Sequence, residues 1–172
     1  MHRRYDTHIE FEWADFASEG YAGVFRPNII SGKGIGGTAY DRKNVNILAH
    51  SGNEKVQGKR FDLISVKGLA PDPELFAYIR DKGRAVEFCV RDIKSAIMSG
   101  NMHRIAFFAR AVRSYKVPYV FTSGARNIYE VKAPREIAFI GELLGFTQRD
   151  VIRSMGEVVE ELFGDREWLK DK

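Results

Sequence analysis

The sequence predicts a parallel α/β fold, either an open sheet or a barrel. Short runs of β-branched and aromatic residues alternate with longer stretches whose apolar residues recur at helical spacing, and the connections are short. Strands that alternate with helices pair in parallel, because each helix carries the chain back across the sheet. With 172 residues, of which 44% are hydrophobic, the chain is long enough to bury a substantial core, and we expect one domain over residues 1–172.

Six segments have the length and composition of buried strands. They comprise residues 5–9, 22–25, 45–50, 62–66, 85–90 and 119–123. Helices are expected between most of them. One has Asp72 as its N-cap and Pro73 at its first position, and it ends at Gly83.

Three further helices follow from apolar spacing. One comes after Asn101, and its apolar stripe consists of Ile105, Phe108, Ala109 and Val112. His103, Arg110 and Arg113 lie mostly away from that stripe, which predicts a cationic outer face. The next helix starts at Pro134 and ends at Gly145. Thr147 caps the last one, and a seam at i, i+4, i+7 and i+11 predicts one continuous helix through Val151, Met155, Val158 and Leu162.

The net charge of +4 is distributed unevenly along the chain. Residues 1–83 carry 12 Lys and Arg against 11 Asp and Glu, and residues 136–172 carry 5 against 9. Residues 84–135 carry 10 against 3, an excess of +7. A basic middle segment indicates one surface that faces a polyanion.

Part of this basic excess lies in a loop at a strand end. The segment YVFTSGARNIYEVKAPR runs from position 119 through the turn residue Gly124 to the helix that starts at Pro134. An anion could meet the side chains of Arg126, Lys132 and Arg135 together with the free N–H groups of the helix start. The alternative is a solvated loop whose arginines pair with nearby carboxylates.

A glycine-rich segment, SGKGIGGT at residues 31–38, contains a formal G-x-G-x-x-G. The dinucleotide-binding fingerprint also needs a strand before it and a long apolar-faced helix after it, but the residues that follow are few and polar. No Gly-Lys-Ser/Thr closes the run, which argues against a phosphate-binding loop. We interpret the segment as a surface loop, from which Lys33 could contact a nucleic-acid backbone.

Side chains near the N-terminus form a candidate metal site. Asp6, His8 and Glu10 alternate along the first expected strand and so point to one face, and His50 closes the third strand. The pattern resembles PHP-type phosphoesterases, whose first strand carries a His-x-His pair, but Glu10 stands at the second histidine position and the later ligands of that family are missing. The alternative is a set of satisfied polar residues at strand ends, and we expect no metal site.

Two other reactive side chains are interpreted as structural. Ser123 lacks a G-x-S-x-G elbow and a suitably placed His and acid pair. Cys89 is the single cysteine and is expected to be a packed core thiol. Because one cysteine forms no intramolecular disulfide and no charged-then-apolar leader opens the chain, we expect a cytoplasmic location. No apolar run approaches the roughly 20 residues of a membrane-spanning helix, so no membrane partner is expected.

Six segments between residues 61 and 163 occur in an order that carries a family resemblance. They are FDLISV at 61–66, RAVEFCVRD at 84–92, the helix after Gly100, VFTSGAR at 120–126, APRE at 133–136 and ELLGFT at 142–147. Their core is a strand ending in Thr-Ser-Gly-Ala, followed by the basic loop, the Pro-acidic helix start and a Leu-Gly turn. The combination resembles the ribonuclease P protein component 3 family, archaeal counterparts of a subunit of eukaryotic nuclear ribonucleases P and MRP. Tyr5, Asp6 and His8 are similar to the family's opening strand.

This resemblance implies a TIM-barrel-like fold that is related to PHP domains but lacks their metal chemistry. Since a full barrel takes roughly 250 residues, we expect fewer than eight strand–helix units, or minimal loops. The implied function is that of a ribonuclease P subunit, which supports a catalytic RNA in removing 5′ leaders from precursor tRNA and is not catalytic on its own. The runner-up is an autonomous PHP-type metal-dependent phosphoesterase, with Asp6, His8, Glu10 and His50 as ligands.

The resemblance also implies partners. These are the ribonuclease P RNA, precursor tRNA through the complex, and ribonuclease P protein component 2 in a heteromeric assembly. No cofactor is expected on the protein itself, since Mg is held chiefly by the RNA. The basic residues expected to contact RNA are Arg91, Lys94, Arg110, Arg113, Arg126, Lys132 and Arg135.

Overall fold

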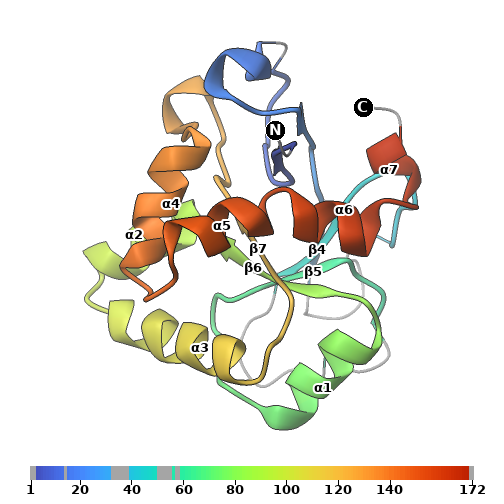
Figure 1. Cartoon of the computed structure of the whole chain (residues 1–172). Coiled ribbons are helices and arrows are strands. Elements are labelled where there is room, and N and C mark those ends of the chain that lie inside the picture. The colour runs from blue at the N-terminus through green and yellow to red at the C-terminus, as the bar shows by residue number, and fades with distance from the viewer. Residues whose placement is uncertain (1–2, 14, 32–38, 50–55, 57–58, 171–172) are drawn as a thin grey trace.

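The chain forms an α/β structure built on parallel strands (Figure 1). The computed structural model describes residues 3–13, 15–31, 39–49, 56 and 59–170. One sheet pairs β1 (Tyr5–Asp6) with β2 (Gly23–Val24). The other has five strands in chain order: β3 (Asn28–Ser31), β4 (Asn46–Ala49), β5 (Leu63–Ser65), β6 (Ala85–Cys89) and β7 (Tyr119–Thr122). Every strand pair is parallel, so the α/β prediction is confirmed.

Seven helices accompany these strands in the described part of the chain. They are α1 (Pro73–Asp81), α2 (Val90–Met98), α3 (Met102–Ser114), α4 (Pro134–Glu142), α5 (Gln148–Ser154), α6 (Glu157–Phe163) and α7 (Glu167–Lys170). Helices α5 and α6 cross in front of the strands in Figure 1 and contact β7. No helix among the described residues has the length and apolar character needed to span a membrane.

The two sheets remain separate in the described residues, so a closed barrel is not observed. The chain passes from β2 to β3 through Phe25, Arg26 and Pro27, and proline has no N–H with which to continue a strand ladder. On the other side, Ile9 forms a parallel bridge with Ala125, just beyond β7. The first segment of the chain therefore lies between β2 and the end of β7.

All six predicted strands contain an observed strand core, and one strand was not predicted. The missed strand is β3, which follows Pro27 and reads Asn-Ile-Ile-Ser. Strand β6 ends at Cys89, one residue before the predicted end, because Val90 already begins α2. Helix α2 was not predicted. Position 50, the expected end of another strand, lies outside the described residues, as do residues 32–38 of the glycine-rich segment.

Two predicted helices are confirmed in detail. The Asp72 side chain caps α1 by accepting a hydrogen bond from the Glu74 N–H (2.9 Å), and Gly83 beyond its end has a positive φ of 59°. Along α3 the expected stripe is the buried one: Ile105, Phe108, Ala109 and Val112. The helix packs this stripe into the main core, which also holds an aromatic group formed by Phe88, Tyr119, Phe121 and Phe146.

The prediction of one continuous helix after Thr147 is wrong. The chain breaks into α5 and α6 around Gly156, and Val159 and Phe163 are buried where Val158 and Leu162 were expected. The N-terminal segment causes the break: the Tyr5 N–H donates to the Met155 carbonyl (2.7 Å). A Cβ at Gly156 would lie 2.2 Å from the Arg3 carbonyl oxygen, so only glycine lets the two segments approach this closely.

The contact between α4 and α5 gives a stability prediction. A Cβ at Gly141 would lie 2.3 Å from Cγ2 of Val151, a stiff β-branched side chain. Gly141→Ala is therefore expected to lower the free energy of unfolding by about 1 to 3 kcal/mol, measured by chemical denaturation, although alanine favours helix formation. Adding Val151→Ala removes the clashing methyl group, so the double variant should lose less than the sum of the two single variants. Additive losses would contradict the steric explanation.

Candidate functional site

Four cationic residues gather at the carboxyl ends of β6 and β7. Arg91 and Lys94 lie in the first turns of α2, directly after β6, and Arg126 and Lys132 lie in the segment that follows β7. Because β6 and β7 are parallel neighbours, the residues that follow them meet at one edge of the sheet. Arg91, Lys94 and Lys132 line one small pocket there, together with Val90, Ser123 and Glu130. We call Arg91, Lys94, Arg126 and Lys132 the carboxyl-end cluster.

Carboxylates neutralise this cluster only in part. Glu10 lies between two of its arginines, at 2.6 Å from Arg91 Nη1 and 3.6 Å from Arg126 Nε. Burial raises the pKa of Glu10, but the hydrogen bond from Arg91 and its charge outweigh this and lower the pKa overall. Lys132 pairs with Glu136 at 3.6 Å, whereas Lys94 is exposed and has no carboxylate partner among the described residues. The cluster thus keeps a net positive charge.

The remaining predicted RNA-binding residues are distributed over other surfaces. Arg135 is exposed in the first turn of α4. Arg113 lies near the end of α3, where its Nη1 donates to the Gly145 carbonyl oxygen and its guanidinium lies 5.4 Å from the centre of the Phe146 ring. Arg110 is exposed one turn earlier on that helix. Since α3 leads into the amino end of β7, Arg110 and Arg113 do not join the carboxyl-end cluster.

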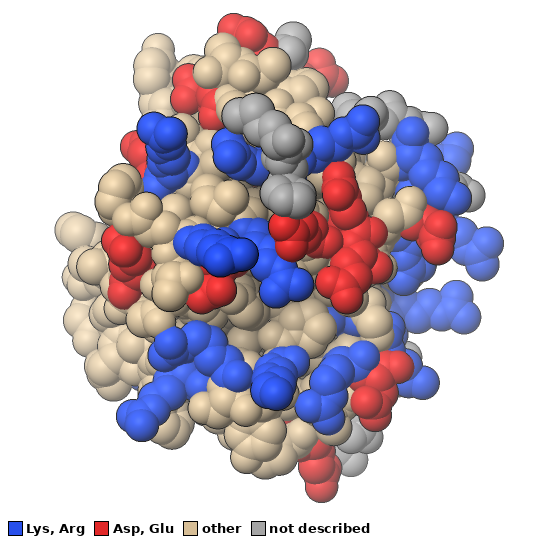
Figure 2. Space-filling model, viewed as in Figure 1, with Lys and Arg blue, Asp and Glu red and all other residues tan. Residues whose placement is uncertain are grey.

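The single polyanion-facing surface predicted from the charge distribution is therefore not what the fold produces. Figure 2 shows lysine and arginine side chains in several groups on one face of the molecule, with acidic side chains between them. The start of α4 is also less available to an anion than expected, because the Glu136 carboxylate accepts a hydrogen bond from the Ala133 N–H (2.8 Å).

A buried polar network lies beside the cluster. His8 Nδ1 donates to Glu87 Oε1 (2.6 Å), and His8 Nε2 lies 3.2 Å from Glu10 Oε1. Thr122 Oγ1 donates to the same Glu87 oxygen (2.8 Å). Both ring nitrogens of His8 face carboxylates, the arrangement that an imidazolium satisfies. Burial lowers the pKa of His8, but the Glu87 charge and the hydrogen bonds to Cys89 and Glu87 together outweigh this, and the pKa lies well above its ordinary value.

Of the four metal ligands proposed from the sequence, the structure describes Asp6, His8 and Glu10, and these three do not converge. The Asp6 carboxylate accepts hydrogen bonds from two backbone N–H groups, those of Ser123 and His8 (both 3.1 Å), and burial raises the pKa of Asp6 to about 6. Glu10 is held by Arg91 and Arg126, and His50 lies outside the described residues. Among the three described candidates, only the side chains of His8 and Glu10 are in contact.

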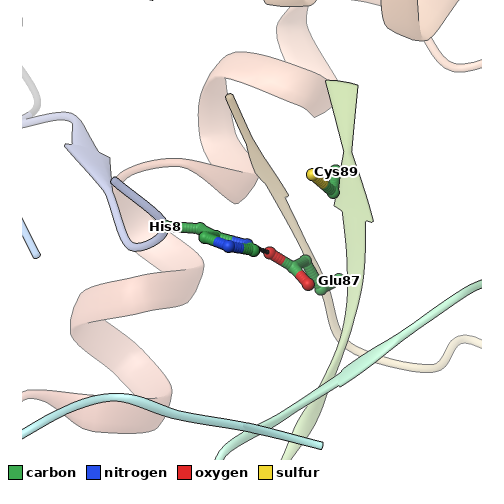
Figure 3. Close-up of side chains that lie close together, drawn as sticks. All are labelled: His8, Glu87 and Cys89. Carbon is green, nitrogen blue, oxygen red and sulfur yellow. Dashed lines mark hydrogen bonds and ion pairs between the residues drawn. The ribbon is translucent and has the colours of Figure 1, made fainter. Parts of the chain in front are cut away.

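The structure instead brings His8 together with Glu87 and Cys89, which sequence reasoning did not select as ligands. One potential ligand atom from each lies within 4.8 Å of the others, and all three residues are buried. Figure 3 shows the imidazole edge directed at the Glu87 carboxylate. Glu87 Oε2 has no hydrogen-bond partner in the described part of the chain. A signal for this group was present: Glu87 and Cys89 alternate in an otherwise apolar strand, so they share a face.

No family model matches the chain, but comparison with known proteins finds a sequence relative and a similar solved structure. The relative is ribonuclease P protein component 3 of Methanococcoides burtonii, 29% identical over 131 residues. The resemblance to component 3 is confirmed. The match covers 73% of this chain and 48% of the component 3 relative, so the chain spans about half the length of the relative it matches.

The similar solved structure is a cryo-EM structure of archaeal ribonuclease P with mature tRNA. One of its chains matches with a TM-score of 0.60 and 14% sequence identity, over 98% of this chain and 82% of that one. At this identity the match shows a common fold.

The raised pKa of His8 predicts a pH dependence of stability. A histidine whose pKa is higher in the folded state stabilises the fold fully below its unfolded pKa, about 6.5, and loses this contribution as pH rises through the folded pKa. The free energy of unfolding should therefore fall with rising pH above about 6.5 more steeply in the parent than in His8→Gln. Chemical denaturation from pH 6 to 9 measures this. Equal slopes for the two proteins would mean that His8 is neutral in the fold.

Proposed function

We propose that the protein is an RNA-binding subunit of ribonuclease P, which supports the catalytic RNA in removing 5′ leaders from precursor tRNA. The observation that carries the proposal is the sequence match to component 3. The geometry agrees with a binding role. Lys94 and Arg126 present exposed charges, and such side chains contact phosphates without performing chemistry.

We propose further that the catalytic Mg is held by the RNA and that the protein supplies no cofactor. The carboxylates that could hold a divalent ion at the sheet edge have other roles: Asp6 accepts backbone N–H groups, and Glu10 pairs with two arginines. A hard cation such as Mg takes oxygen ligands that retain free lone pairs. These carboxylates therefore favour structural support over catalysis.

The proposed partners are the ribonuclease P RNA, precursor tRNA through the complex, and ribonuclease P protein component 2. The fold that this protein shares with a chain of archaeal ribonuclease P supports a place in such an assembly. We place the protein in the cytoplasm, where its buried free thiol, Cys89, is compatible with reducing conditions.

We also propose that residues 1–172 form one barrel-like domain with fewer than eight strands. Two connections support it. The Ile9 N–H donates to the Phe25 carbonyl (3.0 Å) and the Glu10 N–H donates to the Ala125 carbonyl (2.8 Å), so the N-terminal segment contacts both neighbours. Three residues separate β2 from the first strand of the five-stranded sheet, and the last strand of that sheet ends three residues before Ala125.

The functional test is reconstitution with ribonuclease P RNA. Adding the chain and component 2 together should lower the Mg concentration needed for cleavage of precursor tRNA, and neither protein alone should do so fully. Lys94→Ala/Arg126→Ala should lose much of this effect, and its salt dependence of RNA binding should be shallower by about two units, one per lost phosphate contact. Cleavage rates across a Mg titration and binding at several salt concentrations give both readouts.

Arg104→Ala/Arg149→Ala is the matched control, because it removes the same charge from exposed positions outside the cluster. Circular dichroism establishes that each variant is folded. If the cluster variant stimulates cleavage as well as the parent, the assignment of the cluster is wrong. If the parent never stimulates cleavage with component 2, the functional proposal is wrong.

A metal-dependent phosphoesterase is the second candidate, and the group of His8, Glu87 and Cys89 favours it. Nitrogen, oxygen and sulfur ligands in this combination suit Zn, and the unpartnered Glu87 Oε2 is an available ligand atom. Under the subunit proposal, the purified chain should contain less than stoichiometric metal by elemental analysis and hydrolyse no phosphoester with added Zn or Mn. Hydrolysis that appears with metal and disappears in His8→Ala would favour the phosphoesterase instead.

A further inference from the structure

A second cationic pocket lies at the opposite end of the strands from the carboxyl-end cluster. It is lined by Tyr40, Arg42, Arg60, Phe61, Lys82, Arg84 and Arg166, and its volume of about 310 Å³ is at the lower end of the range of ligand pockets. Arg42 precedes β4, Arg60 precedes β5, and Lys82 and Arg84 precede β6. Because these strands are parallel neighbours, their amino ends share one edge, which brings the four cations together. We call the seven lining residues the amino-end pocket.

Among the described residues, Asp62 is the one carboxylate that forms an ion pair with a cation of this pocket. Asp62 is fully buried and lies 3.6 Å from Arg166 Nη2. Its oxygens also accept hydrogen bonds from Tyr40 Oη (3.1 Å) and from the N–H and Nδ2 of Asn46 (both 2.9 Å). The nearby Asp41 carboxylate accepts from the Lys43 N–H and Asn44 Nδ2 within its own turn. In the described part of the chain, Arg42, Arg60 and Lys82 therefore have no carboxylate partner.

Aromatic rings, not carboxylates, hold the innermost arginine. The Arg84 guanidinium lies 4.2 Å from the centre of the Phe61 ring and 5.0 Å from that of Tyr78. Its Nη1 also donates to Tyr78 Oη (3.0 Å). Arg166 is oriented in a similar way, since its Nη1 donates to Tyr40 Oη (3.1 Å). An arginine fixed by rings and hydroxyl groups keeps its full charge and its remaining N–H donors for an external anion.

We propose that the amino-end pocket binds a backbone phosphate of RNA. Five cations against one engaged carboxylate among the described residues leave a positive charge that favours a bound anion, and planar guanidinium groups match the geometry of phosphate oxygens. The RNA assignment rests on the proposed function, whereas the phosphate site stands on the geometry alone. RNA would thus contact this protein at both ends of its strands.

The test uses the full chain and two probes. Sodium pyrophosphate, titrated at constant ionic strength and followed by ¹H–¹⁵N NMR, should produce saturable shifts at the amides of Arg60 and Arg84. Arg60→Gln/Lys82→Gln should abolish these shifts, and its binding to structured RNA should have a salt dependence about two units shallower than that of the parent. Both substituted side chains lack partners in the described structure, so the fold should be retained.

Arg104→Gln/Arg149→Gln removes the same charge from exposed positions elsewhere and should leave the pyrophosphate shifts and most of the salt dependence intact. Unchanged pyrophosphate shifts in the pocket variant would overturn the phosphate site. If the pocket variant loses the pyrophosphate shifts but keeps the salt dependence of RNA binding, the RNA assignment is overturned and the ligand is a free phosphate. If the control variant changes the salt dependence of RNA binding as much as the pocket variant does, the RNA assignment is overturned as well, because net charge then explains the effect. If the parent binds no RNA, the proposed function fails, while the pyrophosphate titration still decides the pocket.

Discussion

The ion pair between His8 and Glu87 is the interaction on which the arrangement of this molecule depends. Glu87 lies in the middle of β6 and is buried, and a buried carboxylate is strongly unfavourable unless a partner compensates its charge. His8 supplies that charge from the N-terminal segment, and the neighbouring Asp6 carboxylate binds the Ser123 N–H at the end of β7. On the β7 side, the backbone of the N-terminal segment forms a single described bridge, between Ile9 and Ala125. The side chains of Asp6 and His8 therefore supply much of its attachment there.

Sequence reasoning succeeded where nearby residues determine the structure and failed where a distant segment or an ambiguous local signal does. Local signals determine the caps of α1 and the buried stripe of α3, so both could be predicted from residues a few positions apart. The break between α5 and α6 could not, because the Arg3 carbonyl that requires Gly156 is more than 150 positions away. The start of α2 at Val90 is a similar case, since an apolar residue at a strand end is compatible with either element.

The cationic sites were predictable in part, and the missing step was topological. Counting charge along the chain placed Arg84 with Arg91 and Lys94, seven to ten positions later, in one basic segment. These residues flank β6, however, so the fold directs Arg84 to the amino end and the other two to the carboxyl end. Given the predicted parallel strands, sorting each basic residue by whether it precedes or follows a strand would have indicated two sites.

The separation of these sites determines how a polyanion would interact with the protein. Strands of three to five residues are about 10 to 17 Å long, and the Debye length is about 10 Å at 0.1 M salt. Charges at opposite ends of the strands are therefore largely screened from each other, so each cluster must attract its own phosphate group. A polyanion that contacts the protein at a single point would use only one of the two cationic sites. Two cationic ends joined by a rigid parallel sheet suit an RNA that folds around the protein, or two RNA segments whose spacing the sheet fixes.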